Sequence, residues 1–219
     1  MARAALSAIV SSTRGRVGNQ VLVRSRAGTV VKARPKYKQF PHPAAAEARG
    51  RLKAASSAWN EMPLEKVVLW RAYAKTVVKF NPVDGQKYSP TAFNAFIGLA
   101  TRFLQANPTG TIPLDPPTAD FAGDDVIVGV EAIPGGVRFT ASGANTPGVV
   151  TLLLVQTLAN IRRSPTSFYK EAAVHGFQRG SPTFDLPLNP GAYAFAYRFI
   201  EAATGLSTGE LLLGVVEVS

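Results

Sequence analysis

The spacing of apolar residues changes along this chain of 219 residues, across a proline-rich segment at 107–117. Between residue 44 and that segment, apolar residues recur every three or four positions, which predicts helices. After it they alternate with other residues, which predicts strands. We therefore expect an α+β protein, with a helical segment at 44–107, a proline-rich linker at 108–118 and an all-β domain at 119–219.

Three helices are predicted in the first part of the chain, at residues 44–62, 64–78 and 91–106. Pro63 suits the first turn of the second helix, and Ser89-Pro90 suits the start of the third. Because tryptophans and phenylalanines fall at helical spacing, we expect a small, tightly packed helical core that holds no cofactor. The residues expected to face this core are Ala48, Leu52, Ala55 and Trp59, then Val67, Trp70, Ala74 and Val77, and finally Phe93, Phe96, Ile97 and Phe103.

Seven short β-rich runs follow, the number expected for an immunoglobulin-like or fibronectin-like sandwich. Ile133-Pro-Gly-Gly-Val137 has the composition of a hairpin turn. The predicted strands are 125–131, 136–141, 149–156, 172–177, 183–188, 192–201 and 210–218. Alternation in the sixth run puts Tyr193, Phe195, Tyr197 and Phe199 on one face, which, if exposed, would offer a surface to a host glycan or a sister subunit.

Residues 17–34 have the pattern of a β-hairpin, because two β-branched runs flank Ser25-Arg-Ala-Gly28. Prolines between residues 35 and 43 then interrupt regular pairing, so we expect residues 1–43 to form an arm that ends in an extended linker. Alternation along the two strands would put Val21 and Val23 on one face, and Arg24, Arg26 and Lys32 around the tip and on the other face.

Positive charge is concentrated in the same region. Residues 1–53 carry twelve Lys and Arg against Glu47 alone, a net charge of +11, whereas the other 166 residues carry twelve bases and thirteen acids. Dense positive charge attracts polyanions, so nucleic acid or an acidic protein surface is the expected partner, unless the charge only keeps an extended segment in solution. Sparse aromatic residues would limit nucleic-acid contact to phosphates. The residues expected to make these contacts are Arg14, Arg16, Arg24, Arg26, Lys32, Arg34, Lys36 and Lys38.

Residues that catalysis and metal binding need are scarce. The chain has no cysteine and only two histidines, His42 and His175, which leaves little material for a zinc site or a serine triad. Asp124-Asp125 lacks the spaced oxygen ligands of a calcium loop, and no phosphate-binding glycine motif occurs. No apolar run approaches the roughly 20 residues of a membrane span. We expect neither an enzyme nor a protein with a cofactor, a metal or a membrane partner.

A helix-turn-helix DNA reader is one alternative, with the helix at 91–106 as its recognition helix. That helix carries only Arg102 as a base, whereas a reader of base edges ordinarily offers several polar or basic side chains. We therefore do not expect sequence-specific DNA recognition.

The assembled pattern resembles a group of small virion-associated structural proteins of bacteriophages and prophages. The resemblance implies a non-enzymatic structural protein whose all-β domain is similar to the add-on domains of phage head and tail proteins. It is carried by Gly15-Arg-Val-Gly18, Arg24-Ser-Arg-Ala-Gly28, Arg51-Leu52, Ala58-Trp-Asn60, Leu69-Trp-Arg-Ala-Tyr-Ala74 and Ser89-Pro-Thr-Ala-Phe-Asn-Ala-Phe96, which all lie in the first half of the chain.

The expected function is therefore that of a virion component in the head, neck or tail of a tailed phage, made in the host cytoplasm. Its expected partners are capsid, portal or tail subunits and further copies of itself, and its basic arm would meet either neighbouring subunits or packaged DNA. The alternatives are a sequence-nonspecific nucleic-acid-binding accessory protein and an enzyme with a substrate site in a cleft between the parts of the chain.

Overall fold

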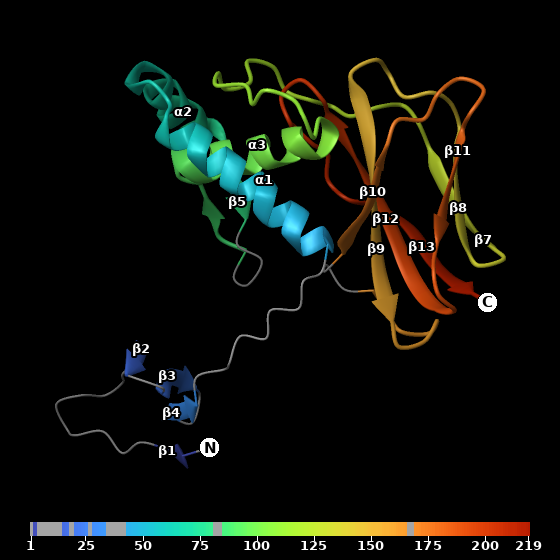
Figure 1. Cartoon of the computed structure of the whole chain (residues 1–219), viewed down its shortest axis with the longest axis horizontal. Helices are drawn as coiled ribbons and strands as arrows, with labels where there is room; N and C mark the ends of the chain where they lie inside the picture. The colour runs from blue at the N-terminus through green and yellow to red at the C-terminus, as the bar shows by residue number, and fades with distance from the viewer. Residues whose placement is uncertain are drawn as a thin grey trace. The chain divides into compact units, whose positions relative to one another are not determined.

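The computed structural model describes residues 2–3, 15–17, 20–25, 28–33, 43–80, 85–165 and 169–219 (Figure 1). The chain divides into two compact units, Met1–His42 and Pro43–Ser219. The described residues contain three α-helices and several antiparallel sheets, so the predicted α+β class is confirmed.

The first unit contains a four-stranded antiparallel sheet with the order β1-β4-β3-β2. The predicted hairpin is confirmed as its two central strands, and Ser25 pairs with Gly28 across a two-residue loop. The two outer strands were not predicted. The four strands are β1 (Ala2–Arg3), β2 (Gly15–Val17), β3 (Gln20–Ser25) and β4 (Gly28–Ala33).

The second unit begins with the three predicted helices, α1 (Pro43–Asn60), α2 (Leu64–Thr76) and α3 (Ala92–Ala106). Pro63 precedes α2 as predicted, but the start predicted for α3 was wrong. Thr91, not Ser89, is its N-cap, and the Thr91 hydroxyl accepts a hydrogen bond from the backbone N–H of Asn94 at 3.2 Å. Two short strands, β5 (Lys79–Phe80) and β6 (Lys87–Tyr88), pair between α2 and α3.

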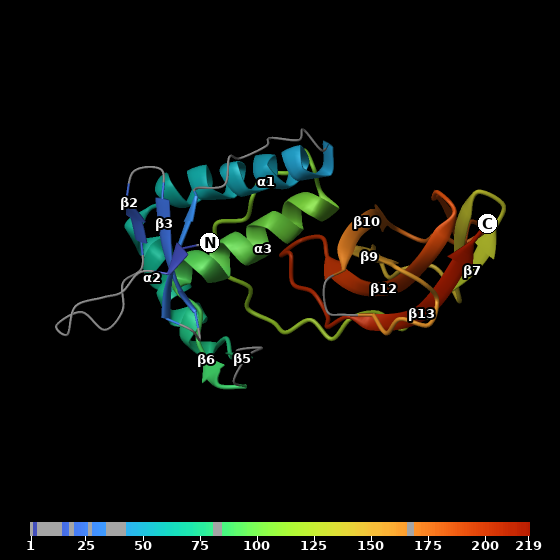
Figure 2. The ribbon, with the colours of Figure 1, turned by 90° about the horizontal axis from the view of Figure 1, so that it is seen from below.

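The helical core is built around α3, which lies alongside α1 (Figure 2). The Phe96 ring centroid lies 5.1 Å from that of Trp70 and 5.5 Å from that of Trp59, so three aromatic side chains fill one small volume. The prediction was wrong at three positions: Ala48 is exposed, Leu52 is 48% exposed and Phe93 is 41% exposed. Helical spacing identifies an apolar stripe but does not show which part of it other elements cover. Even Phe93, whose ring meets that of Trp59 edge to face with centroids 5.7 Å apart, stays partly exposed.

The segment predicted as a proline-rich linker contains no helix or strand between residues 108 and 118, and it lies against α2. The indole Nε1 of Trp70 donates a hydrogen bond to the carbonyl oxygen of Leu114 at 2.8 Å. The Lys66 ammonium donates to the Asp115 carboxylate at 2.5 Å. This segment is therefore packed against the helices that precede it.

All seven strands predicted after it are present, with boundaries shifted by up to three residues. They form two antiparallel sheets, one with the order β10-β9-β12-β13 and one with the order β11-β8-β7. The strands are β7 (Val128–Ile133), β8 (Gly136–Ala141), β9 (Val149–Leu158), β10 (Lys170–His175), β11 (Thr183–Pro187), β12 (Gly191–Glu201) and β13 (Leu211–Val218).

The two sheets enclose one apolar core. Four aromatic side chains of β12 alternate into it, as predicted, and none is more than 9% exposed. A glycan or a sister subunit therefore cannot use them as a surface, and that expectation was wrong. Phe139 of β8 and Phe195 of β12 meet edge to face, with ring centroids 5.5 Å apart. The four β12 aromatic residues are Tyr193, Phe195, Tyr197 and Phe199.

The opposite face of β12 is also buried, because the C-terminal end of α3 packs against the four-stranded sheet. Ala196 and Ile200 are fully buried there beside Ala106 of α3. The Arg102 guanidinium Nε donates to the carbonyl oxygen of Gly205 at 2.9 Å, in the turn after β12. The helices and the two sheets are therefore joined by direct packing and by hydrogen bonds.

Gly205 is the closest point of this contact. Its φ is +77°, and a Cβ added there would lie 2.2 Å from the carbonyl oxygen of Leu99 and 2.8 Å from the backbone nitrogen of Phe103. Only glycine fits this position, because it tolerates both the positive φ and the approach of the helix backbone.

Candidate functional site

The basic residues predicted to make contacts lie in the first unit, and the structure describes three of them. Arg16 lies in β2, Arg24 in β3 and Lys32 in β4. Both Arg16 and Lys32 pair with Val21, so their backbones flank that residue in one row across three strands. The sheet thus brings together bases that are up to sixteen positions apart in the sequence. The other five, Arg14, Arg26, Arg34, Lys36 and Lys38, lie outside the described residues.

The face predicted for Lys32 was wrong. Lys32 lies directly opposite Val21 on the neighbouring strand, and directly paired residues in an antiparallel sheet project to the same face. Lys32 is exposed and Val21 is half-buried. The two-residue loop sets the register of this pairing. A register shifted by one residue would place Lys32 and Val21 on opposite faces of the sheet.

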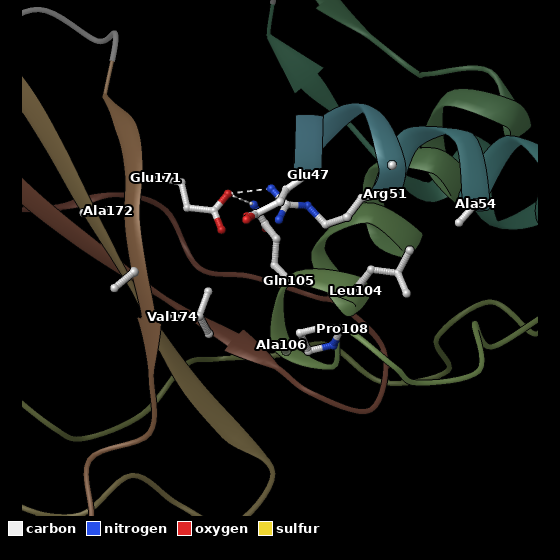
Figure 3. A pocket seen from close by; sticks show the side chains of 12 residues that line it. Glu47, Arg51, Ala54, Leu104, Gln105, Ala106, Pro108, Glu171, Ala172 and Val174 are labelled. Atoms are coloured by element: carbon white, nitrogen blue, oxygen red, sulfur yellow. Dashed lines mark hydrogen bonds and ion pairs between the residues drawn. The ribbon is translucent and has the colours of Figure 1, made fainter. Parts of the chain in front are cut away.

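A groove in the second unit was not predicted. It begins as a cavity of about 730 Å³ between the N-terminal half of α1, the C-terminal end of α3 and strand β10 (Figure 3). Apolar residues form most of its lining, together with three charged residues. The lining residues are Glu47, Gly50, Arg51, Ala54, Leu104, Gln105, Ala106, Pro108, Glu171, Ala172, Ala173 and Val174.

Glu171 of β10 is the polar centre of this cavity. Its carboxylate Oε2 accepts a hydrogen bond from Arg51 Nη2 at 2.7 Å and another from Gln105 Nε2 at 2.9 Å, so residues of α1 and α3 point at one oxygen (Figure 3). The Arg51 side chain is 18% exposed and that of Glu171 is 31% exposed. An ion pair in this partial contact with water contributes at most about 1 kcal/mol to stability. The pair joins α1 to β10 across the cavity.

A second cavity, of about 510 Å³, continues the groove along α1. The two cavities share Ala54, Leu104 and Pro108, and the second is closed on its far side by residues 109–114. The residues that α1 and its C-terminal end contribute recur at three- and four-residue spacing, which puts them on one stripe. They are Glu47, Gly50, Arg51, Ala54, Ala58 and Glu61.

The charge of the groove is opposite to that of the first unit. Three carboxylates line it, those of Glu47, Glu61 and Glu171, against the single guanidinium of Arg51. The net charge of its lining is therefore −2. The other charged side chains of the same helix, Arg49 and Lys53, do not line the groove. The site was not predicted from the sequence, because its walls come from separate segments of the chain, although the stripe on α1 could have been recognised.

Asp124 and His175, which were considered from the sequence as possible site residues, both have structural roles. Asp124 accepts hydrogen bonds from Asn145 Nδ2 at 3.0 Å, from Thr146 N at 2.9 Å and from Thr146 Oγ1 at 2.9 Å, which ties together the loops before β7 and β9. Burial alone would raise the pKa of the Asp124 carboxyl, but these bonds and one from the backbone N–H of Asp125 hold it below its ordinary value.

His175 packs between aromatic rings, with centroids 4.9 Å from Phe177 and 4.7 Å from Phe184. Burial lowers the pKa of His175, because the charged imidazolium is less favourable away from water. Among the residues that the structure describes, no three His, Cys, Asp or Glu side chains are grouped so that they could hold a metal ion.

The helix considered as a DNA-recognition helix is not available for that role. In α3, six residues from Ala95 to Leu104 are buried, and Arg102 is engaged with Gly205. Burial and the nearby Arg198 guanidinium both lower the pKa of Arg102, which is the expected direction for a cation held inside the fold. A helix that packs on both the other helices and a sheet offers no face to the major groove.

None of the helices in the described part of the chain is long and apolar enough to cross a membrane. Comparisons of the chain with protein-family models, with curated proteins and with solved structures found no match.

Proposed function

We propose that this protein is a structural component of a tailed-bacteriophage virion, that its basic N-terminal arm joins it to neighbouring subunits, and that it has no catalytic role. The observation that carries the proposal is the division of charge between the two compact units. Met1–His42 carries nine bases and no acid, whereas Pro43–Ser219 carries fifteen bases and fourteen acids. The first unit has no acidic side chain with which to form ion pairs, so its countercharge must come from outside that unit.

The proposed architecture of the second unit is an immunoglobulin-like or fibronectin-like sandwich. Strands one, two and five of the seven, β7, β8 and β11, share one sheet, and β9, β12 and β13 share the other, as in a constant-type immunoglobulin domain. The difference is the fourth strand, β10, which pairs with the third strand instead of joining the first sheet. Related sandwiches share the two-sheet architecture without sharing every strand order.

Two contacts support this assignment. The Tyr193 hydroxyl, near the start of β12, donates a hydrogen bond at 2.9 Å to the carbonyl oxygen of Asn189, four residues upstream, which is the geometry of a tyrosine corner. Two residues later, Phe195 contacts Phe139 of β8, where an antibody domain has its disulfide between the second and sixth strands. An aromatic pair in place of that disulfide suits a chain with no cysteine.

The proposed location is the virion, in the head, the neck or connector, or the tail, after synthesis in the host cytoplasm. The proposed partners are capsid, portal or tail subunits and other copies of this chain. A protein with this role remains with the particle through purification. Mass spectrometry of purified particles should therefore detect its peptides at a constant ratio to the major capsid protein, and their absence from intact particles would rule the proposal out.

A second candidate function is sequence-nonspecific nucleic-acid binding. The row formed by Arg16, Val21 and Lys32 favours it, because bases that flank one row of a sheet suit phosphate contacts. Sedimentation of the full-length chain with duplex DNA at rising salt tests it. Binding that weakens steeply with salt is expected for phosphate contacts.

The matched variants carry equal losses of charge. Replacing Arg14, Arg16, Arg24 and Arg26 with glutamine should abolish DNA binding, whereas replacing Arg162, Arg163, Lys170 and Arg179, which are exposed in the second unit, should leave it unchanged. DNA binding that survives the first set would eliminate this second function.

A further inference from the structure

We propose that the groove along α1 binds the basic N-terminal segment of a second copy of this chain, through residues 34–40. This inference deepens the proposed function, because it names the surface that would receive the arm. The groove comprises the two joined cavities beside α1, with Glu47, Glu61 and Glu171 as its carboxylates.

Charge is the first argument. Residues 34–40 contain Arg34, Lys36 and Lys38 and no acid, whereas the groove lining has a net charge of −2. Complementary charge favours this occupant and disfavours a nucleic acid, because phosphates would be repelled by the same three carboxylates. Glu47 and Glu61 are both exposed, so they can reach a bound cation without losing their contact with water.

Space is the second argument. Gly50, Ala54 and Ala58 form the α1 side of the groove, and such short side chains let another backbone approach the helix. The stripe from Glu47 to Glu61 extends over about 20 Å at the rise of an α-helix. An extended peptide of about six residues covers the same length. The groove therefore has room for a chain segment and is long for a small molecule.

The far wall is the third argument. Strand β10 is at the edge of its sheet, with a partner on one side only. Its residues Glu171 to Val174 line the groove. An edge strand has backbone groups on its open side that an added extended segment can use, while neighbouring side chains set which segment fits. Here the carboxylates of the groove would select a basic segment.

The period of the basic residues is the fourth argument. Arg34, Lys36 and Lys38 stand at every second position. Bound in extended form, all three would project to the same side of the segment, which would let them face the wall that carries Glu47 and Glu61.

A charge-swap experiment on full-length chains tests the proposal, with self-association measured by sedimentation equilibrium. The groove variant carries Glu47→Lys and Glu61→Lys, and the arm variant carries Lys36→Glu and Lys38→Glu. Each should self-associate about tenfold more weakly than the wild type, because each places like charges together. A matched control, Glu131→Lys with Glu217→Lys, changes two exposed glutamates outside the groove and should associate as the wild type does.

Mixing the two variants gives the decisive result. A groove variant and an arm variant present opposite charges to each other at both contacts, so the mixture should regain wild-type association as mixed oligomers. A wild type that is monomeric, a groove variant that associates normally, or a mixture that stays dissociated would each overturn the inference.

The outcome is separate from that of the particle analysis. Peptides found in virions together with normal association of the groove variant would leave the proposed function standing and remove this inference. If the mixture of variants regains association but no peptides are found in virions, this inference stands and the proposed function is ruled out.

Discussion

Phe139 and Phe195 contact each other from opposite sheets, with ring centroids 5.5 Å apart and ring planes at 84°. Both side chains are fully buried. Their edge-to-face contact joins β8 to β12 at the centre of the core, and it does so by packing alone. The stability of the second unit should therefore depend on the shape of this pair.

Replacing either ring with leucine tests this dependence. Phe139→Leu and Phe195→Leu keep an apolar side chain, so each should lower the free energy of unfolding by about 1–2 kcal/mol. The double variant should lose less than the sum, with a coupling of about 0.5–1.5 kcal/mol, because the aromatic contact is lost only once. Chemical denaturation measures all three. The control is the double variant of Phe195→Leu with Trp70→Phe, which lies in the separate helical core and should give additive losses. Additive losses for Phe139→Leu with Phe195→Leu would show that the ring contact contributes nothing.

The hydroxyl of Tyr193 gives a prediction about a single atom. Tyr193→Phe removes the hydrogen bond to the Asn189 carbonyl and should destabilise the protein by about 1 kcal/mol. Tyr197 is the control, since it is the same residue type on the same face of β12 and its hydroxyl has no partner among the described residues. Tyr197→Phe should leave the melting temperature nearly unchanged. Equal effects of the two substitutions would remove the special role of Tyr193.

Acid should weaken the loop connection at Asp124. Because the folded state holds the Asp124 pKa below its ordinary value, its stabilisation is present above about pH 4 and is lost as pH falls through the folded-state value. The free energy of unfolding of Asp124→Asn should therefore lie below that of the wild type at neutral pH, and the difference should shrink in acid. Asp125→Asn, at the exposed neighbouring residue, is the control and should leave the free energy of unfolding at neutral pH nearly unchanged. A difference that stays constant with pH would contradict this account.

Gly205 gives the most specific prediction at the contact between the helices and the sheets. Gly205→Ala should cost more than about 1 kcal/mol, because alanine disfavours the positive φ and its Cβ would meet backbone atoms of α3. Gly209→Ala is the control in the same connection, where an added Cβ meets nothing within 4 Å. Thermal unfolding distinguishes the two. A Gly205→Ala variant as stable as Gly209→Ala would show that the backbone atoms at this contact move apart at little cost in stability.

Local pattern predicted most of the second unit. Pro63 and the proline-rich segment after Asn107 mark the ends of helices, and strict alternation in residues 192–201 identifies both the strand and its inward face. The seven strands followed from β-branched runs separated by turn residues. These features depend on neighbours in the sequence, which is why they could be predicted.

Features that depend on distant pairing were missed. The face of Lys32 depends on a loop register, and the exposure of Leu52 and Phe93 depends on which elements pack against α1 and α3. The groove needs α1, α3 and β10 together, and Glu171 lies 120 residues from Arg51. No local pattern encodes such a meeting, because tertiary packing decides it.

The close approach at Gly205 has a mechanical consequence. Backbone atoms of the turn after β12 lie directly against backbone atoms of α3, where there is no side chain to compress. A force that pulls the sheets away from the helices therefore acts on a rigid backbone contact, together with the Arg102–Gly205 and Asn107–Ala202 hydrogen bonds.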